Sequence, residues 1–316
     1  MKKSKKMIII AVAAILFLSL SFGVFLIVKH YMDISKTGLR DTLPYGFGKE
    51  ATIILLAGQS NAAGCSRDDY LKRNVSAEQY QEYENGYDNV YINYFASGTN
   101  ESNGFVKCKT RQGEGLENGF FGPELGLAEK LNETYPDRTF FIIKYAWGGT
   151  NLYEQWLSPS GGETAGPLYG SFIEYVKSSV KYLETKNYNV KIEGMCWMQG
   201  EADSMDDGNT MKYEKNLRFF IDDIRREFSN YASDDGIAFV DAYIAATIFW
   251  KNYIELNQAK QAVADSSPMN AVIDTIPHGL TVTNEPEEQP DIAHFDSLSE
   301  IKLGHLFAQE VAKFFD

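Results

Sequence analysis

Cysteine and histidine are scarce in this chain. Its 316 residues include three cysteines and four histidines, and no two cysteines have the C-x-x-C spacing of structural zinc sites. A structural zinc site of that kind is therefore not expected. Cys65 and Cys108 are candidate disulfide partners if the domain lies outside the cytoplasm, whereas Cys196 lies in an apolar run and is expected to be a buried thiol.

Positive charge is also in short supply. The net charge is -13 at pH 7, and residues 1–28 carry four lysines and no acidic residue, so the rest of the chain is more acidic still. An acidic surface repels phosphate backbones, which argues against nucleic acid as a partner. Internal repeats and low-complexity tracts are absent as well. The chain is 44% hydrophobic and 14% aromatic, which is enough for one large core.

The N-terminus has the character of a membrane segment. Four lysines lie within the first six residues and precede an uncharged apolar run, Met7–Val28. As a helix this run would extend about 33 Å, roughly the thickness of a bilayer core. No small-x-small cleavage site follows, so residues 1–28 are expected to be an uncleaved signal anchor, with a cleaved signal peptide or a buried helix as alternatives. The lysines predict a single-pass protein of the cell membrane with an extracytoplasmic domain. Lys29, Lys36 and Arg40 follow the apolar run and reduce the difference in positive charge between its two ends. Secretion after cleavage is the alternative.

Short apolar runs alternate with helical patterns after a stalk predicted at residues 29–47, so one domain is expected over residues 48–316. Such runs are typical of strands buried on both faces. Their alternation with helices predicts a three-layer α/β/α sandwich with a mainly parallel central sheet. The predicted strands are Thr52–Ala57, Val90–Tyr94, Thr139–Ala146, Ile192–Met198, Ile237–Ala242 and Val272–Ile276.

Helices are predicted between and after these strands. Pro123 suits the first turn of one helix, and apolar residues from Tyr213 to Phe228 recur at spacings of three and four. Another helix is expected near Leu256–Ala264. Ser297 and Glu300 have the spacing of a capping box at the start of the last helix.

Ligands of parallel sheets bind beyond the carboxyl ends of the strands, so residues just after the strands are the candidates for chemistry. The first is Ser60, in the sequence Gly58-Gln59-Ser60-Asn61. A strand-to-helix turn can expose a serine hydroxyl to a base and point backbone N–H groups at an oxyanion. The alternative is that Ser60 or Asn61 only caps a helix.

A second motif, Trp147–Leu152, follows the strand at Thr139–Ala146. Gly148 and Gly149 would let a backbone amide approach a ligand closely, and an ordinary turn is the alternative.

A third motif, Trp197–Asp203, ends the strand at Ile192–Met198. Gln199 offers an amide donor at the strand end. Glu201 and Asp203 could orient neighbouring groups, or could be solvated loop acids.

The fourth motif, Asp291–Asp296, precedes the final helix. Asp291 stands three residues before His294 and could accept the N–H of one ring nitrogen, leaving the other free as a base. His305 is expected to be a packed or surface residue of the last helix, and the other two histidines have no aspartate at this spacing.

These ordered motifs resemble the SGNH hydrolase superfamily, and within it the sialate O-acetylesterase-like group that includes carbohydrate esterase family six acetylxylan esterases. The resemblance extends from about Thr52 to the C-terminus and includes Asn257–Gln261 and Ile301–Gly304. It implies a flavodoxin-like fold of the SGNH hydrolase type. It also implies a serine esterase that removes O-acetyl groups from carbohydrates through an acetyl-serine intermediate, without a metal or organic cofactor.

The resemblance also implies roles for particular residues. Ser60 matches the nucleophile, His294 the general base and acid, and Asp291 the residue that orients His294. Gln59 and Asn61 would support the site.

The oxyanion hole implied by the resemblance has three donors. They would be the amide of Ser60, the amide of Gly148 or Gly149, and the side chain of Gln199, which takes the place of the superfamily's asparagine. Glu201 would help position that side chain.

The expected substrate is an acetylated carbohydrate, with sialic acid, xylan and a cell-surface glycan all open. Arg67 or Arg111 could bind an acidic sugar, or could be structural. A lipase or thioesterase of the same superfamily is an alternative, as is a non-catalytic carbohydrate-binding protein on this fold. The combined presence of Ser60, Asp291 and His294 argues against the binding protein.

Overall fold

The structure is a computed structural model that describes residues 36–115 and 119–315. Its centre is an eight-stranded sheet in the order β10-β9-β8-β1-β7-β3-β4, with β5 pairing to β3 outside this path. Most neighbouring strands are parallel, while the short β4 and β5 run antiparallel to β3. The strands are β1 (Glu50–Gly58), β3 (Val90–Ala96), β4 (Asn100–Glu101), β5 (Val106–Lys107), β7 (Phe140–Ala146), β8 (Asn189–Met198), β9 (Ala238–Ala242) and β10 (Asn270–Ile273), and β2 (Ser66–Arg67) pairs with β6 (Phe120–Phe121) in a separate ribbon.

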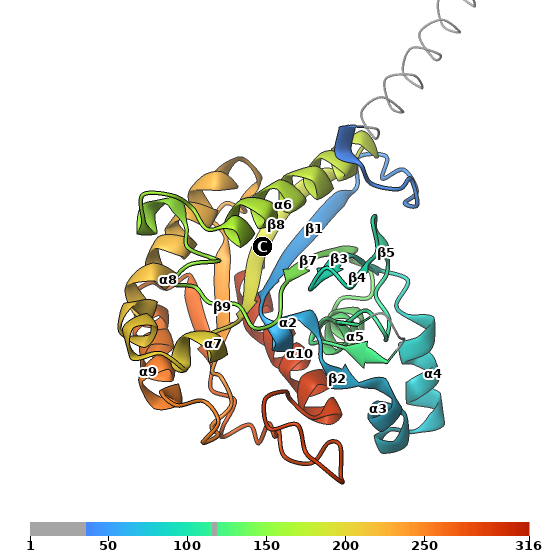
Figure 1. The fold of residues 1–316 in the computed structure, drawn as a ribbon. Coiled ribbons are helices and arrows are strands. Elements are labelled where there is room, and N and C mark those ends of the chain that lie inside the picture. Colours follow the sequence, from blue (N-terminus) through green and yellow to red (C-terminus); the bar gives the residue numbers. More distant parts are fainter. Residues whose placement is uncertain (1–35, 116–118, 316) are drawn as a thin grey trace, which may run out of the picture.

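Helices cover both faces of the sheet (Figure 1), as the sequence predicts. α5 (Glu124–Thr134) and α10 (Ser297–Val311) pack together on one face, and α6 (Pro167–Thr185) and α8 (Asp207–Glu227) lie on the other. The remaining α-helices of the described ranges are α2 (Ser60–Ala63), α3 (Asp68–Asn74), α4 (Ala77–Asn85), α7 (Glu201–Ser204) and α9 (Tyr253–Ala264).

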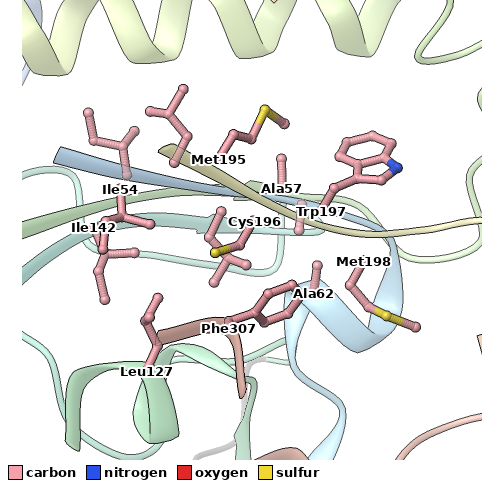
Figure 2. Packing of buried hydrophobic residues seen from close by; sticks show 14 of the residues in the cluster. Ile54, Ala57, Ala62, Leu127, Ile142, Met195, Cys196, Trp197, Met198 and Phe307 are labelled. Carbon is pink, nitrogen blue, oxygen red and sulfur yellow. The ribbon is translucent and has the colours of Figure 1, made fainter. Parts of the chain in front are cut away.

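The central strands are apolar because helices cover them on both faces of the sheet. In β8, Met195 and Trp197 point to one face and Cys196 and Met198 to the other (Figure 2). All four side chains are fully buried. On the second face they approach Phe307 of α10 and its neighbours. A strand covered on both sides has no polar face to present to water, which explains the continuous apolar runs.

Two glycines allow α5 and α10 to approach closely. A Cβ on Gly126 would lie 2.0 Å from the carbonyl oxygen of Ile301, and one on Gly304 would lie 2.2 Å from that of Pro123. Side chains at these positions would force the helices apart. The stretch Ile301–Gly304 therefore serves helix packing.

Two details of the secondary structure differ from the expectations. β10 ends at Ile273, and Asp274 instead accepts a hydrogen bond from the Ile276 amide in a turn. The capping box is wrong, because the Ser297 amide and hydroxyl donate to Glu285 of a distant loop, at 2.8 and 2.7 Å. The Glu300 carboxylate has no hydrogen-bond partner among the residues that the structure describes.

The cysteine pairing is also wrong, since Cys65 and Cys108 are both free thiols. Cys196 is buried, as expected. The predicted membrane segment at residues 1–28 lies outside the described residues. Within residues 36–115 and 119–315, no helix has both the length and the apolar character that a bilayer crossing requires.

Candidate active site

The turns after β1, β7 and β8 meet at one edge of the sheet, because β1 lies between the other two strands. The chain builds β3 and β7 on one side of β1 before it crosses to β8 on the other. Ligands of open α/β sheets bind at such a reversal of strand order. Hydrogen bonds join the turns directly, from the Trp147 amide to Gly58 O at 3.0 Å and from the Gln59 amide to Met198 O at 2.9 Å. Three of the predicted motifs are thus brought together.

Ser60 is the first residue of α2, directly after β1. Gly58 has a φ of 146°, and a Cβ there would lie 1.9 Å from Met198 O, so this turn requires glycine. The Ser60 side chain is largely buried, with 8% of the residue exposed. Its backbone N–H lies in the first turn of a helix, where no intrahelical acceptor exists. Ser60 therefore offers both a hydroxyl and an amide that has no acceptor within the described ranges, at the sheet edge.

Asp291 and His294 form the contact expected from their spacing. Asp291 Oδ2 lies 2.6 Å from His294 Nδ1. The hydrogen bond with His294 lowers the pKa of Asp291 in spite of the opposing effect of burial. Because Nδ1 is occupied, Nε2 is the nitrogen left to exchange a proton with another group.

The loop that carries His294 is held against the turn that carries Ser60. Asn61 Oδ1 accepts from the Phe295 amide at 3.1 Å, and Asn61 Nδ2 donates to Ala293 O at 3.4 Å. The Ser66 hydroxyl donates to Phe295 O at 2.6 Å. The residues on both sides of His294 are therefore tied to the segment that follows Ser60. Ser60 and His294 themselves share no hydrogen bond in the described part of the chain.

Gly148 and Gly149 differ in the use of their amides. The Gly148 N–H donates to the Ser97 hydroxyl at 2.8 Å. The Gly149 N–H has no partner among the described residues. Gly149 has a φ of 68°, and a Cβ added to it would stand in open space. Gly149 is therefore the glycine with a free donor, which the sequence alone did not decide.

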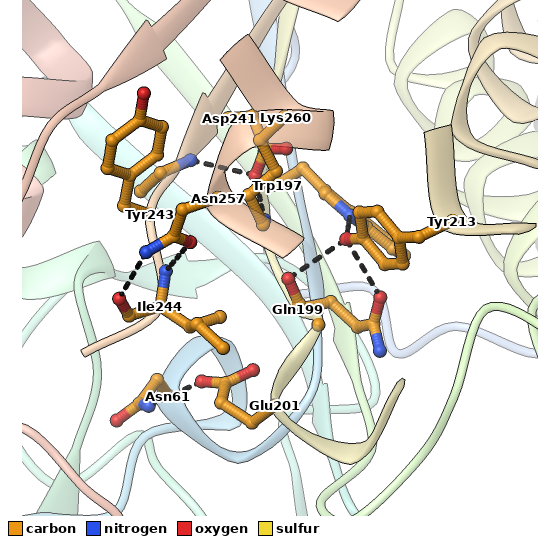
Figure 3. Close-up of polar contacts among 12 residues, drawn as sticks. Asn61, Trp197, Gln199, Glu201, Tyr213, Asp241, Tyr243, Ile244, Asn257 and Lys260 are labelled. Carbon is orange, nitrogen blue, oxygen red and sulfur yellow. Dashed lines mark hydrogen bonds and ion pairs between the residues drawn. The ribbon is translucent and has the colours of Figure 1, made fainter. Parts of the chain in front are cut away.

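Gln199 is fully buried and braces the loop after β7. Its Nε2 donates to Thr150 O at 2.9 Å and to Asp203 Oδ2 at 2.6 Å. Its Oε1 accepts from the Tyr213 hydroxyl at 3.1 Å (Figure 3). Both amide hydrogens are thus engaged within the protein. The donation of Gln199 to an oxyanion stays a prediction.

Glu201 and Asp203 are fully buried rather than solvated loop acids. Glu201 Oε1 accepts from Asn61 Nδ2 at 2.7 Å (Figure 3), whereas Oε2 has no partner in the described part of the chain. Burial raises the pKa of Glu201 and raises that of Asp203 to about 6. Gln59 supports the same turn, since its Oε1 accepts from the Ala202 amide at 3.2 Å.

The stretch Asn257–Gln261 lies behind the site and serves structure. Asn257 exchanges two hydrogen bonds with the backbone of Ile244, at 3.0 and 3.1 Å. Lys260 forms a buried ion pair with Asp241 at 2.6 Å (Figure 3). These contacts fix α9 against β9 and the segment that follows it.

The two candidate arginines have different surroundings. Arg111 is bonded to Asp68 at 2.8 Å and to Glu84 at 3.2 Å, so it ties surface helices together. Arg67 pairs with Asp69 at 3.0 Å, and both of these side chains are about half exposed. Arg67 also lines a cavity together with His294. Arg67 is therefore the arginine that lies near the site.

Sequence reasoning missed two residues of this region. Ser97, which binds the Gly148 amide, follows the predicted strand Val90–Tyr94, so the rule of strand ends could have found it. Glu114 lies so close to Gly148 that a Cβ on that glycine would be 2.9 Å from Glu114 Oε2. Glu114 follows no predicted strand, and no local signal in the sequence marks it.

Comparisons with known proteins agree with this architecture. The chain resembles solved structures of a protein from Arabidopsis thaliana (TM-score 0.61, 16% identity, 84% of this chain and 99% of that one) and of NanS (0.59, 16%, 86% and 98%). A carbohydrate acetylesterase from Xanthomonas citri is similar as well (0.55, 15%, 83% and 56%). At these identities the likeness concerns the fold. No match was found among curated proteins.

The family described as "Carbohydrate esterase, sialic acid-specific acetylesterase" matches residues 50–313, which is most of the chain and contains all the site residues named above. The chain therefore belongs to the sialic acid-specific acetylesterase family of carbohydrate esterases.

Proposed function

We propose that this protein hydrolyses O-acetyl esters of carbohydrates with Ser60 as nucleophile. The observation that carries the proposal is the bonded pair Asp291–His294 on a loop that Asn61 ties to the Ser60 turn. A serine, a histidine and an oriented carboxylate at one sheet edge are the groups that acyl transfer requires. Family membership supports the ester chemistry and the carbohydrate class.

In the proposed mechanism, His294 Nε2 takes the Ser60 proton while the hydroxyl oxygen attacks the acetyl carbonyl. Asp291 holds the ring in the correct orientation through Nδ1. The amides of Ser60 and Gly149 donate to the oxyanion. The C–O bond to the sugar then breaks, His294 returns the proton to the sugar oxygen, and acetyl-Ser60 remains. Water attacks this ester with His294 again as base and releases acetate.

The substrate we propose first is an acetylated sialic acid, the sugar named in the family's description. Such a sugar carries a carboxylate. Arg67 lines the cavity next to His294. Its ion pair with Asp69 is exposed, and such pairs contribute at most about 1 kcal/mol to stability. Arg67 can therefore turn to an acidic substrate at little cost.

The test is acetate release by the wild-type protein and by Ser60→Ala and His294→Ala. Both variants are expected to lose at least about 10³-fold in kcat, since removal of a triad member leaves only residual catalysis. Ser229→Ala and His278→Ala, at exposed positions, serve as matched controls. A Ser60→Ala protein with near wild-type activity would eliminate the mechanism. Cleavage of 4-nitrophenyl palmitate in preference to 4-nitrophenyl acetate would favour a lipase instead.

We also propose that the domain is held at the outer side of a cell membrane by residues 1–28. This proposal rests on the lysine cluster and the apolar run alone. Accessibility of the domain to protease on intact cells, together with its retention in the membrane fraction, would test it.

A further inference from the structure

A cavity of about 480 Å³ opens beside His294. One wall is the loop that carries Asp291 and His294, and another is formed by the β2–β6 ribbon with Arg67. Phe249, from the segment after β9, lines it as well. No residue of the turn after β7 contributes to its lining. The cavity therefore lies on the histidine side of the site, away from the predicted oxyanion donor Gly149.

The direction of proton transfer determines on which side of Ser60 the sugar lies. In the proposed mechanism His294 returns a proton to the departing sugar oxygen, which must lie within hydrogen-bond reach of the ring. The carbonyl oxygen must instead face the amides of Ser60 and Gly149. The two halves of the ester therefore point to opposite sides of Ser60, with the sugar toward the surface that His294 lines.

We infer that the cavity beside His294 is the subsite for the leaving sugar, a pyranose ring that stacks on Phe249. The inference rests on the proposed function. A volume of about 480 Å³ lies within the range of small-molecule sites and far exceeds the needs of an acetyl group.

Phe249 has the exposure and support of a stacking platform. It is 44% exposed, although it belongs to a residue type that is usually buried. Its ring rests edge-on against Trp250, with 4.6 Å between centroids, and this contact limits its orientations. Arg67 and Gln289 of the same cavity supply donors for the hydroxyl and acidic groups of a sugar. An apolar surface surrounded by polar groups is complementary to a pyranose ring, which has both apolar C–H groups and polar hydroxyl groups.

The test compares Phe249→Ala, Phe249→Tyr and the wild-type protein on sugar and non-sugar acetates. The sugar substrates are O-acetylated N-acetylneuraminic acid and a mono-O-acetylated methyl xyloside. Ethyl acetate is the non-sugar substrate, because its leaving group has no ring to stack. Ile254→Ala is the matched control, since Ile254 is 52% exposed on α9 and does not line the cavity.

Phe249→Ala is expected to lower kcat/KM about fivefold to tenfold on at least one of the two sugars, mainly through KM. Ethyl acetate hydrolysis should change less than twofold, and Phe249→Tyr should restore sugar activity. Equal losses on sugar and ethyl acetate, or no loss on any sugar that the wild type cleaves, would overturn the inference alone. Wild-type protein that cleaves ethyl acetate but neither sugar would overturn the proposed function, and the subsite with it.

Discussion

Asn61 donates a hydrogen bond from its side chain to the fully buried carboxylate of Glu201, over 2.7 Å. The same amide bonds to the backbone on both sides of His294. One side chain thus joins the turns after β1 and β8 to the loop before α10. This arrangement makes Asn61 and Glu201 candidates for positioning residues, which act through His294 rather than on the substrate.

Asn61→Ala is expected to lower kcat on 4-nitrophenyl acetate about 10²-fold with little change in KM, because small misplacements of a catalytic group have effects of that size. Asn61→Asp should not restore activity, since an aspartate cannot donate to Glu201 and repels it. The double variant Asn61→Asp/Glu201→Gln reverses donor and acceptor and should recover part of kcat. Strictly additive losses in this double-mutant cycle would contradict the positioning role.

Gln199→Ala is expected to lower both the thermal stability and kcat. The substitution leaves Thr150 O without its buried donor. It also removes one donor to Asp203, which keeps the amides of Leu152 and Tyr153, and one acceptor of the Tyr213 hydroxyl, which keeps the Gln199 carbonyl. An unsatisfied buried group costs about 1–3 kcal/mol. Thermal unfolding and ester hydrolysis measured on the same sample would check this, with Gln309→Ala at an exposed position as control. An unchanged Tm with kcat reduced about 10²–10³-fold would instead indicate a donor to the oxyanion with no bracing role.

Glu300→Gln is expected to weaken the dependence of stability on pH. Burial raises the pKa of Glu300 well above its usual range, and neither carboxylate oxygen has a hydrogen-bond partner within residues 36–115 and 119–315. The native state therefore retains a proton that the unfolded chain releases above a pH of about 4.3. Stability from this group is complete below that pH and is lost as pH rises toward the folded-state pKa, by up to about 1.4 kcal/mol per pH unit.

The measurement is chemical denaturation of wild type and Glu300→Gln between pH 4 and pH 8. The decline of unfolding free energy with pH should be shallower in the variant. Glu163→Gln, at an exposed position, should keep the wild-type slope. The same slope in all three proteins would show that Glu300 is not the group that binds the proton.

Arg67→Gln is expected to remove a preference for acidic sugars. The wild-type protein should cleave O-acetylated N-acetylneuraminic acid about tenfold better than its methyl ester, a difference of about 1.4 kcal/mol. The variant should treat the two alike, because the methyl ester has lost the charge that Arg67 faces. Arg73→Gln is the neighbouring control, since the Arg73 guanidinium lies over the Tyr70 ring and does not line the cavity. A preference that survives in Arg67→Gln would assign carboxylate recognition to another group.

Local patterns in the sequence determined the layers of the fold and one contact of the site. Apolar runs and helical spacings predict the longer strands and the helices α5, α8, α9 and α10, because they depend only on which faces are buried, whereas α6 was not predicted. The pairing of Asp291 with His294 follows from a separation of three residues in one loop. The choice of Ser60 rests on its place after a predicted strand and on the resemblance of four ordered motifs.

Tertiary structure alone decided how the site is held together. Asn61 and Phe295 are 234 positions apart, and their hydrogen bond depends on β1 lying beside β8 and on α10 packing against α5. The use of the Gly148 amide by Ser97, the engagement of Gln199 by Thr150, and the capping of α10 by Glu285 are likewise contacts between distant segments. No spacing encodes them, because buried donors take whichever acceptors the packed elements bring within reach.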